Sequence, residues 1–178
     1  EAGLDRLREL GAEPLRVDVA DPASVSGLAW SLDGEELDLA LYVAGVLDPH
    51  DAKTPPTREA FDRVMHANVL GLMQALPQVM PAVEAAGGVF AAFSSEMSQV
   101  GLVDGSDAWL YRVSKAAVNM AVASARHSYP GATCVALDPG WVQTDMGGGK
   151  APDAPADVVA GMLRLIDAAT PAQSGQFF

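Results

Sequence analysis

The sequence predicts an α/β fold, a doubly wound parallel sheet with helices on both faces, because short apolar runs alternate with helical segments along its 178 residues. Four apolar runs have the length of a strand and end in turn-forming or polar residues, as expected of strands buried on both faces. The connections are short, and the chain shows no internal repeat, low-complexity tract or linker. We therefore expect residues 1–178 to form a single domain.

The predicted elements follow one another in order. The first residues have the pattern of a helix tail, and the four apolar runs predict strands at 13–19, 37–45, 88–95 and 132–140. Helical periodicity predicts further helices at 23–32, 57–88, 106–128 and 156–169.

Capping residues support three of these helices. Asp21 precedes Pro22, which suits the first turn of the helix over 23–32. Thr57 caps the long helix, Gly87-Gly88 ends it, and its two prolines, Pro77 and Pro81, are expected to bend or break its second half. The helix over 106–128 is expected to start from a Ser106 or Asp107 cap.

Charge and composition limit the classes of molecule that we expect the protein to bind. The formal net charge is −12, and no cluster of Lys and Arg is present, so we expect neither a nucleic acid nor a membrane surface as a partner. The single cysteine, Cys134, lies in an apolar run and is predicted to be a buried, inert thiol, which fits a cytoplasmic location. No apolar stretch reaches about 18 residues, the length of a membrane span. We expect a small-molecule ligand and predict no metal site.

Small and polar residues follow each predicted strand. They are the pairs at 18–19, 44–45, 94–95 and 139–140. Each pair alone is typical of an ordinary turn or helix cap. Ligands of doubly wound sheets lie at the carboxyl ends of the strands, so together these pairs predict one crevice.

Tyr111 and Lys115 are four residues apart on the predicted helix over 106–128. Such a spacing places both side chains on one helix face, where the ammonium would favour the phenolate and lower the tyrosine pKa. The pair could then move a proton at an alcohol or a carbonyl. A tyrosine packed on the sheet beside a solvated lysine is the plainer interpretation. Ser95 after a strand and Asn68 within a helix favour the functional one.

These motifs resemble the short-chain dehydrogenase/reductase family, and most closely its C-factor and sniffer-like carbonyl reductase branch. The matching pieces occur in family order, as VDVAD at 17–21, YVAG at 42–45, HANVLG at 66–71, FSSEMS at 93–98, YRVSKAAVNM at 111–120 and LDPGWVQTDMGG at 137–148. The resemblance implies a Rossmann-type fold and hydride transfer between NAD or NADP and a carbonyl or secondary alcohol. It also implies a homodimer or homotetramer formed through the helices at 57–84 and 106–128.

The resemblance also implies residue roles. Tyr111 would exchange the proton, Lys115 would hold the nicotinamide ribose and lower the tyrosine pKa, Ser95 would orient the carbonyl, and Asn68 would hold a relay water. The implied cofactor-binding residues are Asp18 and Val19 at the adenine, Ala44 and Gly45 at the cofactor backbone, and Pro139, Gly140, Val142 and Thr144 at the nicotinamide.

Some positions depart from the family pattern. Tyr42 and Val43 stand where the family commonly has two asparagines, so a strand hydrogen bond is expected to be lost. Ser98 stands where a glycine is usual, and Ser95 lies 16 positions before Tyr111, which implies a long intervening loop. We prefer Ser95 to its neighbouring serines for the catalytic role.

The family's first strands and glycine-rich phosphate turn would precede residue 1. Their absence leaves the choice between NAD and NADP open, and it predicts unpaired apolar strand edges, so that these 178 residues expressed alone would be insoluble or molten. The terminal SGQFF suggests a last strand cut short. The GGGK run at 147–150 lacks the pattern of a phosphate-binding loop and suggests a substrate-covering loop.

Two other functions remain open. A signalling or regulatory protein could keep the fold and bind a dinucleotide without turnover. An epimerase or dehydratase of the extended branch would use the same Tyr and Lys, but it would normally carry a larger substrate domain. The substrate itself is not readable, since the large apolar residues near the strand ends could line a pocket or belong to the core: Met97, Trp109, Trp141 and Met146.

Overall fold

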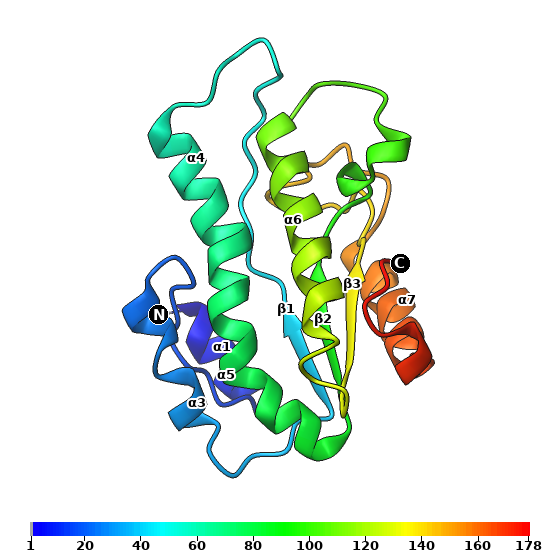
Figure 1. The fold of residues 1–178 in the computed structure, drawn as a ribbon. Coiled ribbons are helices and arrows are strands. Elements are labelled where there is room, and N and C mark those ends of the chain that lie inside the picture. The colour runs from blue at the N-terminus through cyan, green and yellow to red at the C-terminus, as the bar shows by residue number, and fades with distance from the viewer. Residues whose placement is uncertain (1) are drawn as a thin grey trace.

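The computed structural model describes residues 2–178 and contains a three-stranded parallel sheet (Figure 1). Its strands are β1 (Leu39–Tyr42), β2 (Val89–Phe93) and β3 (Thr133–Leu137), in the order β1-β2-β3. β2 lies between the other two, with Leu39 opposite Val89 and Val89 opposite Thr133. The predicted parallel α/β sheet is confirmed over these three strands.

Helices cover both faces of the sheet. On one face, Phe90 and Ala92 of β2 pack with residues of α5 (Gly71–Ala86) and α6 (Trp109–Ala125). On the other face, Ala91 packs with Ile166 of α7 (Pro155–Asp167). Neighbouring residues of one strand therefore face different helix layers, as a doubly wound sheet requires, and Figure 1 shows α7 on the side opposite α5 and α6.

Short helices make up most of the first 32 residues. They are α1 (Ala2–Glu9), α2 (Pro22–Val25) and α3 (Leu28–Ser31). The Asp21 carboxylate accepts from the Ala23 N–H at 3.0 Å, which confirms the predicted cap. The single helix expected over 23–32 is wrong, because α2 and α3 are separate helices with Gly27 as the N-cap of α3.

Residues 13–19 do not form the strand that the sequence predicted. Residues 12–18 have no regular secondary structure and 19–20 form a turn. An extended segment becomes a strand only when another strand pairs with its backbone, and within residues 2–178 no strand does so. Val17 and Val19 nevertheless pack against the core, so the apolar pattern correctly predicted burial.

The long helix predicted over 57–88 is confirmed in extent but not in shape. The Thr57 hydroxyl accepts from the Ala60 N–H at 3.1 Å at the start of α4 (Arg58–Met65), and Gly87 ends α5 in the left-handed conformation. Pro77 and Pro81 do not break the helix, since α5 continues through both. The irregularity lies earlier, in a π-helical turn at His66–Leu70.

α6 begins later than predicted. Its N-cap is Ala108, in the left-handed region with φ of 49°, instead of Ser106 or Asp107. The loop after β1 supplies the missing hydrogen bonds, because the Pro49 carbonyl accepts from Ala108 and the His50 carbonyl accepts from Trp109, at 3.4 and 3.2 Å. A side-chain cap is therefore not needed at this helix start.

The last residues run along β3. After a 3₁₀ turn at Pro171–Gln173, the Phe178 N–H donates to the Ala136 carbonyl at 3.0 Å, and Phe177 forms a single parallel bridge with Ala136. The strand-like character expected of SGQFF is thus present as one bridge. On the opposite side of the sheet, Leu41 and Val43 of the β1 segment are exposed.

Candidate active site

A pocket of about 840 Å³ lies where the carboxyl ends of the strands meet α6 and the first turn of α7. Its wall includes three predicted catalytic residues, Ser95, Tyr111 and Lys115. The crevice predicted from the residues after the strands is therefore present, and Gly45, Ser94, Ser95, Pro139 and Gly140 all line it.

Lys115 is buried beneath the pocket, with 4% of its surface exposed. Its ammonium donates to the Phe93 carbonyl at 2.7 Å, at the end of β2. Burial lowers the pKa of Lys115 to about 8, because the charged form loses its hydration. Gly45 permits this approach of strand and lysine, since a Cβ at that position would lie 3.4 Å from the Lys115 Nζ and 3.3 Å from the Asn68 Oδ1.

Tyr111 shares the helix face with Lys115, as predicted, but its environment differs from the prediction. The Lys115 Nζ lies 5.6 Å from the centre of the Tyr111 ring, over its face. Burial raises the pKa of Tyr111, the Ser95 hydroxyl opposes this rise, and the Asp138 carboxylate adds to it. The net shift of the Tyr111 pKa is therefore upward, opposite to the lowering predicted from the spacing, because burial outweighs the hydrogen bond with Ser95.

Ser95 lies close to the end of β2, on the wall of the pocket. Its hydroxyl accepts from the Met97 N–H at 3.2 Å. Ser94 also lines the pocket, but its hydroxyl donates to the Lys115 carbonyl at 3.3 Å. Ser98 faces inward, donating to the Ser95 carbonyl and accepting from Asn119. The preference for Ser95 in the catalytic role stays a prediction.

Asn68 is fully buried within the π-turn and does not line the pocket directly. Its side-chain oxygen accepts from the Val46 N–H at 2.7 Å, and its amide nitrogen donates to the Val46 carbonyl at 2.9 Å and to the Ser114 hydroxyl at 2.8 Å. Ser114 in turn donates to the Tyr111 carbonyl at 2.7 Å. Asn68 thus joins the loop after β1 to the helix that carries Tyr111.

The predicted cofactor-binding residues fall into two groups. Gly45 and the residues after β3 share the pocket with Tyr111 and Lys115, namely Pro139, Gly140, Val142 and Thr144. Asp18, Val19 and Ala44 lie outside its wall. The Asp18 carboxylate accepts from the Ala20 N–H in its own turn at 2.9 Å, and Val19 and Ala44 pack against the core.

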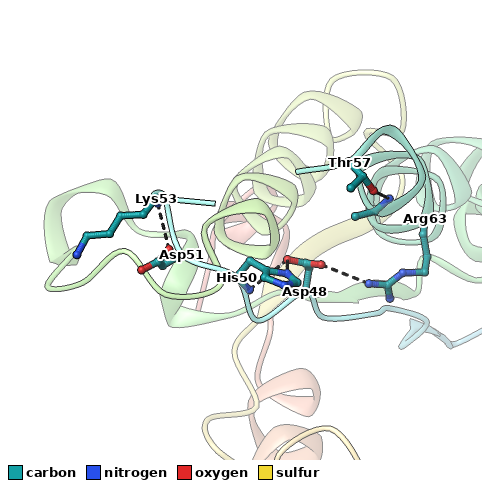
Figure 2. A network of polar contacts seen from close by, with 7 residues as sticks. Asp48, His50, Asp51, Lys53, Thr57 and Arg63 are labelled. Carbon is teal, nitrogen blue, oxygen red and sulfur yellow. Dashed lines mark hydrogen bonds and ion pairs between the residues drawn. The ribbon is translucent and has the colours of Figure 1, made fainter. Parts of the chain in front are cut away.

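The loop at 46–56 forms one side of the pocket through Leu47 and Pro49. Asp48 anchors it, with only 4% of its surface exposed. Its carboxylate lies 3.0 Å from the His50 Nδ1 and 3.6 Å from an Arg63 guanidinium nitrogen on α4, as Figure 2 shows. Burial alone would raise the pKa of Asp48, but the hydrogen bonds from His50 and the charges of His50 and Arg63 outweigh it and lower the pKa.

The sequence analysis missed Asp48 and Ser114. An aspartate in a loop after a strand is unremarkable in composition, and the only signal was the Asp-Pro-His order that allows Asp48 to reach His50 two residues on. Ser114 lay inside the YRVSK run, one position before Lys115, where a buried hydroxyl in mid-helix needs a partner.

Both large apolar side chains and charged side chains line the pocket. Met97, Trp141 and Met146 line it, as the sequence allowed, whereas Trp109 does not. Gly147 of the GGGK run also lines it, and its carbonyl accepts from the Trp141 indole at 2.8 Å. The charged residues in the wall are four acids and two bases: Glu96, Asp104, Asp107, Asp138, Arg112 and Lys115.

The family described as enoyl-(acyl carrier protein) reductase matches residues 2–175. Two relatives agree with it. C-signal of Myxococcus xanthus is 40% identical over 119 residues, which are 65% of this chain and 72% of that protein. The 1-hydroxy-2-glutathionyl-2-methyl-3-butene dehydrogenase of Rhodococcus sp. strain AD45 is 31% identical over 90% of this chain and 74% of that protein. The chain belongs to the short-chain dehydrogenase/reductase family.

Solved short-chain dehydrogenase/reductase structures share this fold. The NADPH-bound carbonyl reductase from chicken fatty liver superimposes with a TM-score of 0.87 at 27% identity, covering 98% of this chain and 79% of that one. The carbonyl reductase Sniffer of D. melanogaster gives 0.83 at 23% identity, over 92% and 73% of the two chains, and supports the fold alone. The resemblance identified from the motifs is confirmed.

Residues 2–178 contain neither a membrane-spanning helix nor a metal-binding cluster of side chains. None of the helices described there has the length and apolar character of a membrane span. In the same part of the chain, His, Cys, Asp and Glu side chains do not gather into a group of three able to hold a metal ion. Cys134 is buried, and burial raises the pKa of its thiol to about 11, in keeping with the inert role predicted for it.

Proposed function

We propose that this protein transfers a hydride between NAD or NADP and a carbonyl or secondary alcohol, with Tyr111 as the proton donor or acceptor. The observation that carries the proposal is the shared pocket in which Tyr111, Ser95 and the buried Lys115 ammonium meet. The chicken and Burkholderia multivorans structures, described with bound NADPH and NADP, are each 27% identical to this chain and support the cofactor class.

The residues present fit a nicotinamide nucleoside. An ammonium has three N–H donors, and the hydrogen bond from Lys115 to the Phe93 carbonyl leaves two for the hydroxyls of a ribose. Gly45 keeps a side chain out of the space beside the Lys115 Nζ. Pro139, Gly140, Val142 and Thr144 are assigned to the nicotinamide side of the pocket, and Asp18, Val19 and Ala44 to the adenine side on the resemblance alone.

In the direction of reduction, the nicotinamide when bound supplies the hydride to the carbonyl carbon. Tyr111 donates its hydroxyl proton to the carbonyl oxygen, so the product is the neutral alcohol. Burial favours the protonated phenol before the step, and the Lys115 cation stabilises the phenolate that the step leaves behind. Ser95 donates to the carbonyl oxygen and orients it. Solvent protons then restore Tyr111, with Asn68 assigned to a water in that relay.

The charges and apolar residues of the pocket also indicate a substrate class. Four carboxylates and two cations line it, and Met97, Trp141 and Met146 form an apolar wall. We assign the site to neutral or cationic apolar carbonyls in preference to keto acids, because an added carboxylate would meet a net negative wall.

The decisive experiment is turnover by the purified protein with NADPH and with NADH. The absorbance of the reduced nicotinamide is followed with a panel of uncharged aromatic and aliphatic ketones and aldehydes, beside Tyr111→Phe as the inactive control. Oxidation of the cofactor that depends on both the carbonyl and Tyr111 is the expected result. Cofactor binding in calorimetry without turnover of any carbonyl or alcohol would contradict the proposal.

That contradictory outcome is what the second candidate function expects. The relative C-signal carries a signalling name, and a dinucleotide-binding regulator with little turnover would keep the same fold. The meeting of Ser95 and Tyr111 in the pocket favours the enzyme, since a regulator that only binds the dinucleotide would use Lys115 but would need no proton donor.

We also propose that the protein is a cytoplasmic homodimer or homotetramer joined through α4, α5 and α6. Exposed apolar side chains on these helices and on the π-turn between α4 and α5 support this assembly: Phe61, Leu70, Met73, Val113 and Met120. Other apolar residues of these helices are buried in the core and do not contribute to this surface: Val64, Leu72, Leu76, Val118 and Val122.

A further inference from the structure

Tyr42 ends β1 at a position where the sequence departs from its family, and its hydroxyl group is engaged. It donates to the Ala67 carbonyl at 2.9 Å, in a bond that is buried and joins residues 25 positions apart. The ring belongs to the main core cluster, and 8% of the residue is exposed. The hydrogen bond that the sequence suggested was lost at this position is replaced by one to a helix.

The acceptor of this hydrogen bond is the Ala67 carbonyl, which loses its α-helical partner in the π-turn. In an α-helix the Gly71 N–H would donate to the Ala67 carbonyl, four residues back. In the π-turn at His66–Leu70 it donates to the His66 carbonyl, five residues back. A buried carbonyl without a partner costs about 1 to 3 kcal/mol, so the Tyr42 hydroxyl stabilises the π-turn over a regular helix.

The π-turn in turn positions Asn68. One additional residue in a helical turn rotates the following side chains by about 100° around the axis. With the turn in place, Asn68 makes its three hydrogen bonds to Val46 and Ser114, at 2.7 to 2.9 Å. Gly71 allows Tyr42 to approach, because a Cβ there would lie 2.7 Å from the Tyr42 hydroxyl and 2.7 Å from the Val19 carbonyl.

We infer that Tyr42 is a positioning residue of the active site, which holds Asn68 in place by taking the free carbonyl of the π-turn. The inference rests on the proposed function only in the role given to Asn68. Tyr42 itself does not line the pocket and acts through the helix backbone.

The test is Tyr42→Phe, which keeps the ring in the core and removes the hydroxyl, with Tyr129→Phe as the matched control. Tyr129 is partly buried and packs against the same core cluster. The readout is NMR of the ¹⁵N-labelled protein, namely hydrogen exchange of the Val46 amide and the chemical shifts of the Asn68 side-chain amide. We expect Val46 exchange to be about tenfold faster and the Asn68 signals to move in Tyr42→Phe alone. Unchanged Val46 exchange and Asn68 signals would overturn the inference.

A kinetic arm separates this inference from the proposed function. If Asn68 serves turnover, kcat falls about tenfold in Tyr42→Phe, and adding Tyr42→Phe to Asn68→Ala slows the enzyme no further. Additive losses in this cycle would show that Tyr42 acts by another route and would overturn the inference. A moved Asn68 signal with unchanged kcat would support the positioning of Asn68 and contradict the relay role proposed for it.

Discussion

The Lys115 ammonium lies over the face of the Tyr111 ring, 5.6 Å from its centre, while its hydrogen bond goes to the end of β2. In this buried arrangement the pKa values of the two residues shift in opposite directions. Burial favours the neutral form of each, so it raises the pKa of Tyr111 and lowers the pKa of Lys115 to about 8. At neutral pH the tyrosine carries the proton to be donated, and most of the lysine is still charged.

Replacing Tyr111 with phenylalanine is expected to lower kcat for carbonyl reduction by about 10² to 10⁴, the range of general acid catalysis. The ring stays in place, so cofactor affinity and thermal stability are expected to change little. Stopped-flow or steady-state oxidation of the reduced nicotinamide measures the loss, and Tyr129→Phe serves as the control. Retention of most of the rate would remove Tyr111 from the role of proton donor.

Replacing Lys115 with methionine tests the buried charge through the pH dependence of stability. In the folded protein the pKa of Lys115 is about 8, below its unfolded value, so the unfolded chain binds more protons between the two values. Wild-type stability relative to Lys115→Met is therefore expected to rise from pH 7 to pH 10, by roughly 1 to 3 kcal/mol. Denaturant unfolding at both pH values measures the difference. A constant difference would mean that Lys115 is not desolvated in the folded state.

Replacing Asp48 with asparagine is expected to destabilise the protein at pH 7 by about 1 to 3 kcal/mol, because the charge that pairs with His50 and Arg63 is lost. The folded-state pKa of Asp48 is lowered, so its contribution is present above the unfolded value and is lost as the pH falls through the folded one. The gap between wild type and Asp48→Asn should thus close in acid. Asp51→Asn in the same loop is the control, and denaturant unfolding is the measurement.

A charge placed on α6 tests the proposed assembly. Met120 is 68% exposed, and Met120→Lys is expected to shift the protein from dimer or tetramer to monomer at micromolar concentration. Light scattering coupled to size-exclusion chromatography gives the mass. Leu10→Lys changes another exposed apolar residue outside these helices and should leave the mass unchanged. A wild-type protein that is already monomeric under these conditions would refute the assembly.

Substrate charge can be tested with a matched pair of ketones, an acetylbenzoate and its methyl ester. We expect kcat/KM for the ester to exceed that for the acid by about tenfold at low ionic strength, and the ratio to shrink in salt. Asp104→Asn should narrow the ratio, because Asp104 lines the pocket, whereas Asp33→Asn should not. A preference for the acid would reassign the substrate class.

Local signals predicted much of this fold. Asp21, Thr57 and Gly87 cap helices as their types predict, and the apolar runs of β1, β2 and β3 gave the sheet. The errors arose where the deciding partner is distant in sequence. The π-turn depends on a Tyr42 hydroxyl 25 residues before its acceptor, and the α6 start depends on backbone carbonyls of the loop after β1.

For the active site, too, local signals predicted the features that depend on neighbouring residues and missed those that depend on distant ones. Spacing alone placed Tyr111 and Lys115 on one helix face, and strand order brought Ser95 to them. Spacing could not indicate how deeply each group is buried, which reverses the expected direction of the Tyr111 pKa. Asn68 and Ser114 are 46 positions apart in the sequence and lie on different helices, so no local pattern predicts their hydrogen bond.

The hydrogen bonds of the loop after β1 also define where the protein tolerates insertion. Its first half is held at Asp48 and by the carbonyls of Pro49 and His50, which complete the start of α6, so added residues there would disturb the helix of Tyr111. Its second half forms a local turn, with Thr54 bonded back to Asp51, followed by two exposed prolines. A peptide tag or a fluorophore-bearing segment placed between Thr54 and Pro55 would therefore leave intact the part of the loop that lines the pocket, at Leu47 and Pro49.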